Sequence, residues 1–359
     1  MENILKNARN LLREVKYPGS SKDVIALDMV HNMQIEDKTI RFQLIFQKTD
    51  DPFIRSIVQK CENILREKGG FEDVIIEKIF SKDLERPASL EKVKHIIAVS
   101  SGKGGVGKST VSANLSIALA KSGYKVGLID ADIFGPSIPK MFGCEDARPD
   151  LKTVGERQYI VPVERYDIKL LSIGFFVEPD SATVWRGPLA SNALKQIIGQ
   201  GLWDELDYLL IDLPPGTSDI HLTVVQTLAL DGAIVVSTPQ AVALADATKG
   251  INMFQSEGVN VPVLGLIENM AWFTPEELPE NKYYIFGKEG AKKLAEKTEI
   301  PLLGQIPIVQ SIRECCDNGC PSAYDENSIV GMAFMDVANK LAFIAETNGM
   351  TAKRVRISN

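Results

Sequence analysis

The chain has 359 residues, of which 45% are hydrophobic and 24% are charged, ordinary values for a protein with a large buried core. Its net charge of -7 argues against a nucleic-acid partner, because binding to phosphates needs a basic surface. The sequence has neither an apolar run long enough to cross a bilayer nor a signal-peptide core, so we expect a cytoplasmic protein without a membrane partner.

Residues 1–80 have the pattern of a small α/β domain. Apolar residues at helical spacing predict two helices, and alternating or extended apolar stretches predict three strands. Residues 81–94 are polar and contain Pro87, which predicts a linker to the next domain. The predicted helices cover residues 4–12 and 52–68, and the extended segments cover 24–34, 38–46 and 74–79.

The stretch HIIAVSSGKGGVGKST, residues 95–110, predicts a phosphate-binding loop. A buried strand leads into a glycine-rich loop, and Lys108 opens a segment with helical apolar spacing, which completes the pattern G-x-x-x-x-G-K-S. Glycines let backbone N–H groups surround a phosphate, while Lys108 supplies a charge for the β- and γ-phosphates and Ser109 a hydroxyl for magnesium. The residues expected to bind the nucleotide are Gly102, Lys103, Gly104, Gly105, Val106, Gly107, Lys108, Ser109 and Thr110.

Lys103 is an additional lysine that an ordinary phosphate-binding loop does not need. The loop GKGGVGKS resembles the deviant Walker A motif of the MinD/ParA/ArsA/NifH class of dimeric ATPases. In that class the extra lysine reaches the nucleotide of the partner subunit. The resemblance therefore implies a homodimer in which Lys103 takes part in catalysis across the interface, together with Lys108 at its own site.

Apolar runs that alternate with helical segments continue to about residue 346. This alternation is typical of a P-loop NTPase with a mostly parallel sheet that helices cover on both faces. We place the ATPase domain at residues 95–346 and a basic tail, expected to be frayed, at 347–359. Further strands are predicted at 125–129, 168–173, 208–211, 233–236 and 263–267.

Aspartates follow two of these strands, at the edge of the sheet where ligands bind. Asp212 fits a magnesium-binding aspartate, and the N–H of Gly216 after it fits a sensor of the γ-phosphate. In the deviant Walker class the second aspartate of a D-x-D pair orients the attacking water. The resemblance therefore makes Asp132 catalytic and Asp130 a support of the magnesium site. Alternatively, these carboxylates are strand caps or solvated turn residues.

Asn269 lies in the segment IENM, residues 267–270, at the end of a late strand. Its amide offers a donor and an acceptor, which match the Hoogsteen edge of adenine, whereas the N-K-x-D signature of a guanine site is absent. Pro307 is expected to lie beside the base, where the backbone makes contacts. The alternative is that Asn269 only caps the strand.

Several longer motifs together resemble the Mrp/ApbC iron–sulfur cluster carrier ATPases, over nearly all of residues 95–345. The resemblance implies a homodimer that binds a bridging 4Fe–4S cluster and hands it to apo iron–sulfur proteins, with hydrolysis of Mg-ATP tied to transfer. Residues 1–80 resemble the PaaD/SufT-like assembly domain, with Asp51 where that family often has a cysteine. The motifs are GKGGVGKS, DADIFGPSIPKMFG, WRGPL, DYLLIDLPPGTSD, IENM, YYIFG and SIRE.

The family holds its cluster with a Cys-x-x-Cys pair between the IENM and YYIFG motifs, but residues 271–282 of this chain contain no cysteine. Iron in such clusters prefers soft thiolates, for which the glutamates of this stretch are poor substitutes. Cys315, Cys316 and Cys320 follow downstream and offer a relocated iron–sulfur site. The alternative is that they are small buried residues beside a turn.

Two other functions compete with cluster transfer. The missing Cys-x-x-Cys favours a nucleotide-switched protein that binds a partner without carrying a cluster. A MinD/ParA-like positioning ATPase would need a membrane-binding helix or a basic surface for DNA. The tail is too short for such a helix, and the net negative charge argues against such a surface.

Overall fold

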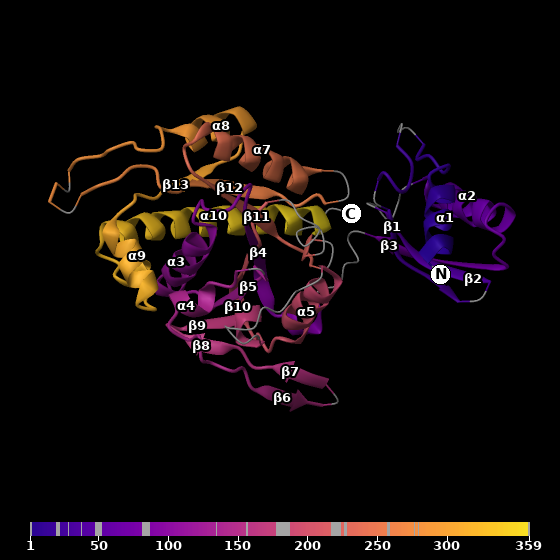
Figure 1. Ribbon diagram of the computed structural model, residues 1–359, viewed down its shortest axis with the longest axis horizontal. Helices are drawn as coiled ribbons and strands as arrows, with labels where there is room; N and C mark the ends of the chain where they lie inside the picture. The colour runs from indigo at the N-terminus through magenta and orange to yellow at the C-terminus, as the bar shows by residue number, and fades with distance from the viewer. Residues whose placement is uncertain are drawn as a thin grey trace. The chain divides into compact units, whose positions relative to one another are not determined.

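The chain folds into two compact units, Met1–Glu85 and Arg86–Asn359, in the computed structural model of Figure 1. Among the described residues, no helix is both long enough and apolar enough to span a membrane. The structure describes residues 2–18, 22–27, 29–36, 38–46, 52–80, 87–133, 135–155, 157–176, 187–216, 224–225, 228–256, 259–275, 277–278 and 280–357.

The first unit is a three-stranded sheet with two helices. The sheet order is β1-β2-β3, where β1 runs antiparallel and β3 parallel to β2. Alternate residues of β2 are fully buried, as the alternation of the sequence predicts. The predicted extended segment 24–34 is wrong over its first residues, because the carboxylate of Asp23 accepts two backbone N–H bonds and closes a turn. The elements are α1 (Glu2–Leu12), β1 (Val30–Glu36), β2 (Thr39–Phe46), α2 (Ile54–Glu67) and β3 (Asp73–Phe80).

The second unit is built on an eight-stranded sheet with the order β13-β12-β11-β4-β10-β5-β9-β8. All neighbouring strands are parallel except the edge pair β8 and β9, so the predicted mostly parallel α/β fold is confirmed. A separate exposed hairpin of β6 and β7 was not predicted. The strands are β4 (Val93–Ser101), β5 (Val126–Asp130), β6 (Leu151–Val154), β7 (Arg157–Ile160), β8 (Val163–Arg165), β9 (Ile168–Ser172), β10 (Leu206–Asp212), β11 (Gly232–Ser237), β12 (Val263–Glu268) and β13 (Leu302–Gln305).

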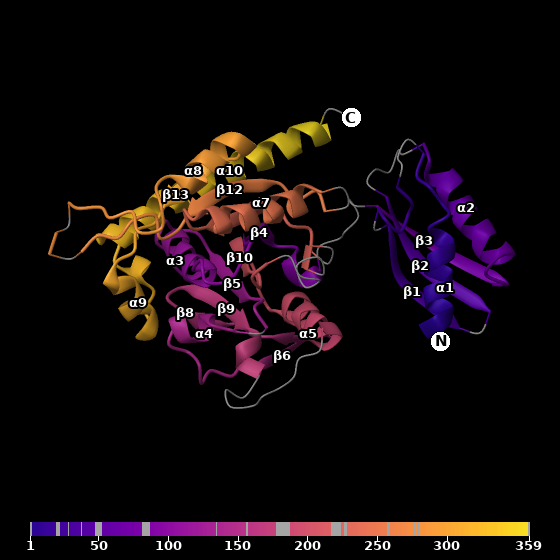
Figure 2. The same ribbon diagram turned by 45° about the horizontal axis from the view of Figure 1, so that its top comes forward.

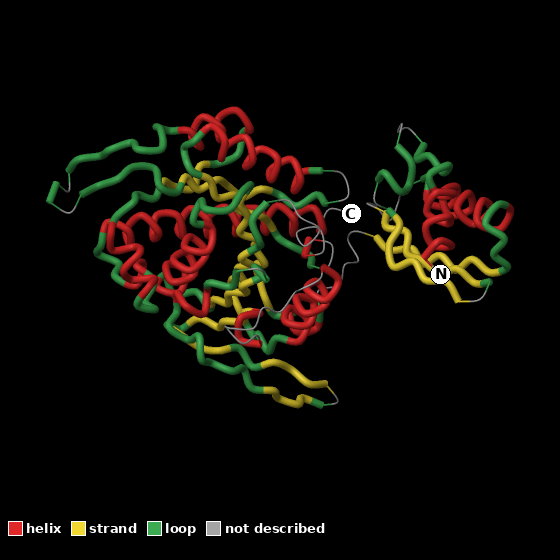
Figure 3. The backbone as a smooth tube through the Cα atoms, viewed as in Figure 1, coloured by secondary structure: helices red, strands yellow, loops and turns green. Residues whose placement is uncertain are grey.

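Helices cover both faces of this sheet, as Figure 3 shows. Alternate residues of β4 supply two separate cores: Ile97 and Val99 pack with α3 and α10, while Ile96 and Ala98 pack with α5, α7 and α8. Strands buried on both faces account for the continuous apolar runs of the sequence. The helices are α3 (Lys108–Lys121), α4 (Ile138–Met141), α5 (Gly187–Gln200), α7 (Ala241–Gln255), α8 (Gly290–Thr298), α9 (Gln310–Asp317) and α10 (Ile329–Ile357), with short 3-10 turns η2 (Ala88–Leu90), η3 (Ile173–Phe176) and η4 (Ser322–Tyr324).

Two predicted boundaries differ from the bounds of the observed elements. The linker 81–94 ends earlier, because Leu90 and Val93 are 0% and 2% exposed in the core of the second unit. Its residues 81–86 lie outside the described part of the chain. Helix α10 extends to Ile357 and so includes most of the predicted basic tail, whose lysine and arginine residues are good helix formers.

Candidate nucleotide-binding site

The phosphate-binding loop connects β4 to α3, and its glycines are required by its geometry. Gly105 and Gly107 have φ of 82° and 79°, a left-handed conformation that favours glycine. A Cβ on Gly102 would lie 2.1 Å from the backbone of Asp246, and one on Gly107 would lie 2.3 Å from the amide nitrogen of Asn269. A Cβ on Gly105 would meet open space, so the tip of the loop faces outward. This cradle of backbone fits a phosphate group.

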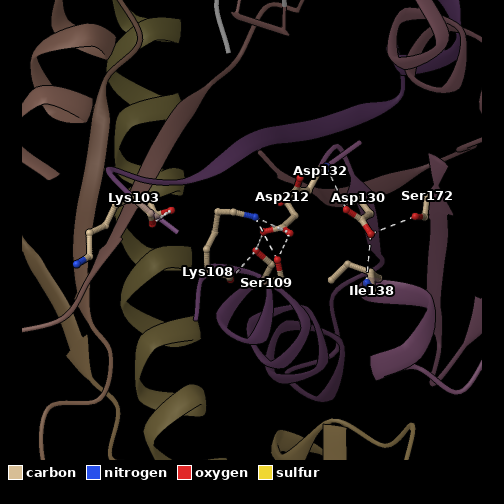
Figure 4. A network of polar contacts seen from close by, with 10 residues as sticks. Lys103, Lys108, Ser109, Asp130, Asp132, Ile138, Ser172 and Asp212 are labelled. Carbon is tan, nitrogen blue, oxygen red and sulfur yellow. Dashed lines mark hydrogen bonds and ion pairs between the residues drawn. The ribbon is translucent and has the colours of Figure 1, made fainter. Parts of the chain in front are cut away.

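Asp212, at the end of β10, joins three polar side chains of α3 (Figure 4). Its Oδ2 accepts the Ser109 hydroxyl at 2.6 Å and lies 2.8 Å from Lys108 Nζ. Its Oδ1 accepts the hydroxyl of Ser112 at 2.6 Å. Asp212 is fully buried, and Lys108 is 5% exposed. The structure therefore brings the two predicted magnesium ligands, Ser109 and Asp212, into direct contact beside the loop lysine.

Asp130 lies beside Asp212, because the two residues are register partners on the neighbouring strands β5 and β10. Its carboxylate accepts the backbone N–H of Asp132 at 3.1 Å and of Ile138 at 3.2 Å, and the hydroxyl of Ser172 at 3.1 Å. Burial, and then the charge of Asp212, raise the pKa of Asp130 to about 7. Asp130 thus holds the start of the loop that follows β5. Asp132, two residues further along this loop, is half-buried and is labelled in Figure 4.

The two remaining residues expected to act on the γ-phosphate have different surroundings. The N–H of Gly216 donates to the carbonyl of Ser101 at 3.0 Å, so contact with a phosphate requires exchange of that bond. The side chain of Lys103 extends away from Lys108 and Asp212 (Figure 4). This direction agrees with a lysine that does not serve the phosphates of its own loop.

Asn269, at the end of β12, contacts the phosphate-binding loop directly. Its Nδ2 donates to the carbonyl of Val106 at 2.8 Å, and the residue is 6% exposed. This bond uses one amide hydrogen, while a primary amide has a second hydrogen and an acceptor oxygen for a base. The preceding Glu268 is fully buried and accepts the N–H of Ala291 and the amide of Gln305, the latter at 2.7 Å. Pro307 is buried just after β13.

The three cysteines proposed as iron ligands lie in different surroundings. Cys316 is buried and hydrogen-bonds to Asn114, whereas the thiol of Cys320 contacts the hydroxyl of Tyr166. Among the described residues, no group of three or more His, Cys, Asp or Glu side chains is arranged to hold a metal ion. The relocated iron–sulfur site at these cysteines therefore stays a prediction.

Ser112 and Ser172 are site residues that the sequence analysis missed. Each holds one of the two buried aspartates, Ser112 from α3 and Ser172 from the end of β9. Ser112 follows Ser109 by three residues, a spacing that places both on one helix face. Residues 185–186 of the WRGPL motif and 217–219 of the DYLLIDLPPGTSD motif lie outside the described residues.

Comparison with known proteins identifies the family of the chain. The family model described as NUBPL iron-transfer P-loop NTPase matches residues 92–342, and one described as iron-sulfur cluster assembly protein matches residues 6–77. A Synechocystis protein named iron-sulfur cluster carrier protein is 40% identical over 92% of this chain and 95% of its own length.

Two solved structures share the fold of the second unit. A nucleotide-binding protein of Archaeoglobus fulgidus, solved in complex with ADP, is 39% identical with a TM-score of 0.59, over 71% of this chain and 96% of that one. The cell division ATPase MinD of Pyrococcus furiosus is 26% identical with a TM-score of 0.52, over 70% and 99% of the two chains. The predicted resemblance is therefore confirmed, and the chain belongs to the NUBPL iron-transfer family of P-loop NTPases.

Proposed function

We propose that this protein is a dimeric, magnesium-dependent ATPase of the cytoplasm that carries iron–sulfur clusters to apo-proteins. Cluster transfer is supported by the family and by relatives named iron-sulfur cluster carrier proteins. A second matching family, of iron-sulfur cluster assembly proteins, covers the first unit. The ATPase assignment is supported above all by the direct contacts of Asp212 with Ser109 and Lys108.

The side chains around Asp212 suit a magnesium-bound triphosphate. Bound Mg²⁺ would neutralise charge on the β- and γ-phosphates. The Ser109 hydroxyl and the Asp212 carboxylate are hard oxygen ligands, which magnesium prefers. Lys108 exchanges its partner Asp212 for phosphate oxygens when the nucleotide binds, which requires only that a flexible side chain change direction.

Hydrolysis further requires groups that act on the attacking water and on the developing charge. We assign the first role to Asp132, whose carboxylate orients the water and accepts its proton late in the reaction. Lys103 acts on the phosphates of the partner subunit, as an arginine finger does. In the same cycle, Gly216 exchanges its bond to Ser101 for one to the γ-phosphate.

Two substitutions separate ATP binding from hydrolysis. Lys108→Ala removes a charge-assisted hydrogen bond and should weaken ATP binding roughly ten- to hundredfold in calorimetry. Asp132→Ala should bind ATP like the parent and lose turnover. An Asp132→Ala protein that hydrolyses ATP at the parent rate would contradict the catalytic assignment.

One observation favours a second candidate, a nucleotide-switched protein that binds a partner without a cluster. The long loop between β12 and α8, which projects from the second unit in Figures 1 and 2, occupies the place of the family's cluster ligands. It contains no cysteine, and the described residues gather no substitute ligand set. Thiolates are the ligands that iron–sulfur clusters require.

Anaerobic reconstitution with iron and sulfide distinguishes the two candidates. A stoichiometric cluster that is lost when Cys315, Cys316 and Cys320 are all replaced by Ser would establish a carrier that assembles its ligands between subunits. The opposite outcome is weak, substoichiometric iron, with ATPase activity unchanged in the triple variant. That result would favour the partner-binding function.

A further inference from the structure

Two partly exposed thiols lie at the two ends of one hydrogen-bonded turn, where helix α9 ends. The N–H of Cys320 donates to the carbonyl of Cys315 at 2.9 Å, and the N–H of Gly319 donates to Cys316 at 3.3 Å. Gly319 has φ of 73°. These two bonds and the left-handed glycine define a Schellman motif, in which the side chains of the first and last residues of the six-residue turn frequently contact each other. Cys315 and Cys320 occupy those two positions.

The other three cysteines of the chain have different surroundings. Cys61, Cys144 and Cys316 are 0%, 6% and 9% exposed. Burial raises the pKa of Cys61 to about 12 and that of Cys144 and Cys316 to about 11. Because the thiolate is the reactive form of cysteine, these three thiols are poor nucleophiles at neutral pH. Partial exposure to solvent and the two end positions of the turn are therefore combined in one pair, Cys315 and Cys320.

We propose that Cys315 and Cys320 form a redox-active dithiol, which low-molecular-weight disulfides oxidise to an intramolecular disulfide. The thiolate of one cysteine attacks a sulfur of the reagent, forms a mixed disulfide and releases one reagent thiolate. The thiolate of the second cysteine then displaces the other half of the reagent. The protein loses two electrons and two protons, and the reagent disulfide is reduced to two thiols. This site is independent of the proposed ATPase function.

The turn is held in place on several sides, which favours closure of the disulfide. A Cβ on Gly319 would lie 2.5 Å from the Cα of Gly143, so the two backbones pack closely there. The hydroxyl of Tyr166 donates to the carbonyl of Gly319 at 2.9 Å. Farther along, Ala323 donates to the side chain of Asn114 on α3 at 2.8 Å.

This packing has a consequence for the disulfide. A disulfide forms without strain when the two Cα atoms are close, as the ends of such a turn are. Since the backbone is already ordered by its neighbours, oxidation orders few further groups. We therefore expect ring closure to outcompete a stable mixed disulfide at either sulfur.

The test is a thiol count on the full-length protein after anaerobic incubation with oxidised glutathione. The reduced chain has five thiols, and one disulfide should lower the count in denaturant to three, with full recovery after reduction. Cys315→Ser and Cys320→Ser each have four thiols and should form no internal disulfide. Every thiol of these variants should stay free or carry glutathione as a mixed disulfide. The matched control, Cys316→Ser, should fall from four thiols to two.

Peptide mapping and intact mass identify the bond itself. The expected product has lost two hydrogen atoms, and its disulfide joins residue 315 to residue 320. Three results would overturn the proposal: five free thiols after oxidation of the parent, a bond that includes Cys316, or a stable glutathione adduct without an internal bond. ATPase activity within twofold of the reduced protein would show that the fold is intact during the measurement.

Discussion

Ser112→Ala tests whether the buried hydroxyl next to the phosphate-binding loop holds Asp212 in place. The Ser112 hydroxyl lies 2.6 Å from Asp212 Oδ1, and both residues are fully buried. A hydrogen bond to a charged group contributes about 1.5–3 kcal/mol, and its loss leaves a buried acceptor with one partner fewer. The free energy of unfolding should therefore fall by that amount. Less firmly held, Asp212 should also bind magnesium more weakly.

Ser116→Ala is the matched control on the same helix. The Ser116 hydroxyl is equally buried but donates to the carbonyl of Ala113 at 2.7 Å, a neutral bond within the helix. Its loss costs about 0.5–1.5 kcal/mol, which the better helix propensity of alanine partly offsets. Urea unfolding should separate the two variants by about 1–2 kcal/mol, and only Ser112→Ala should need more magnesium, by roughly five- to tenfold, for half-maximal ATPase activity. Equal unfolding energies and unchanged magnesium dependence in both would refute the reasoning.

Three further predictions follow from other residues of the site. The folded-state pKa of Asp130 is raised from 3.8 to about 7, so the folded protein binds this proton more tightly than the unfolded chain does. The contribution of Asp130 to the free energy of unfolding should therefore fall by up to roughly 4 kcal/mol as the pH rises from 4 to 8, and Asp130→Asn should remove that slope in urea titrations. ATP should bind more tightly than GTP by about 1–3 kcal/mol, because the Asn269 amide and guanine O6 would place two acceptors together; equal affinities in calorimetry would contradict the role of Asn269. A Lys103→Ala subunit paired with an Asp132→Ala subunit should recover hydrolysis at the site that combines an intact Asp132 with a Lys103 from its neighbour. No recovery in verified heterodimers would argue against action in trans.

The parts of the site that the sequence predicts are those encoded by local spacing. The glycine loop, Lys108 and Ser109 are contiguous, and Asp212 directly ends an apolar strand, so each is visible without knowledge of the fold. Carboxyl ends of parallel strands meet at one edge, which is why the separate motifs converge.

The contacts between these motifs depend on the order of strands in the sheet, which spacing does not encode. Asp130 and Asp212 become neighbours only because β10 lies between β4 and β5. The bonds from Ser112 and Ser172 to these carboxylates follow from that order. The hairpin of β6 and β7 was missed for another reason: most of its residues are exposed, so no apolar pattern marks it.

The bond between Asn269 and the carbonyl of Val106 ties the position expected to read the base to the loop that holds the phosphates. Rotation of the amide toward a different base would withdraw its hydrogen from that carbonyl and loosen the turn at Gly107, which packs against the same amide nitrogen. We therefore expect that discrimination between nucleotides is not confined to the base pocket. A poorly fitting base would also distort the backbone that surrounds the phosphates, and it would therefore affect hydrolysis of the nucleotide.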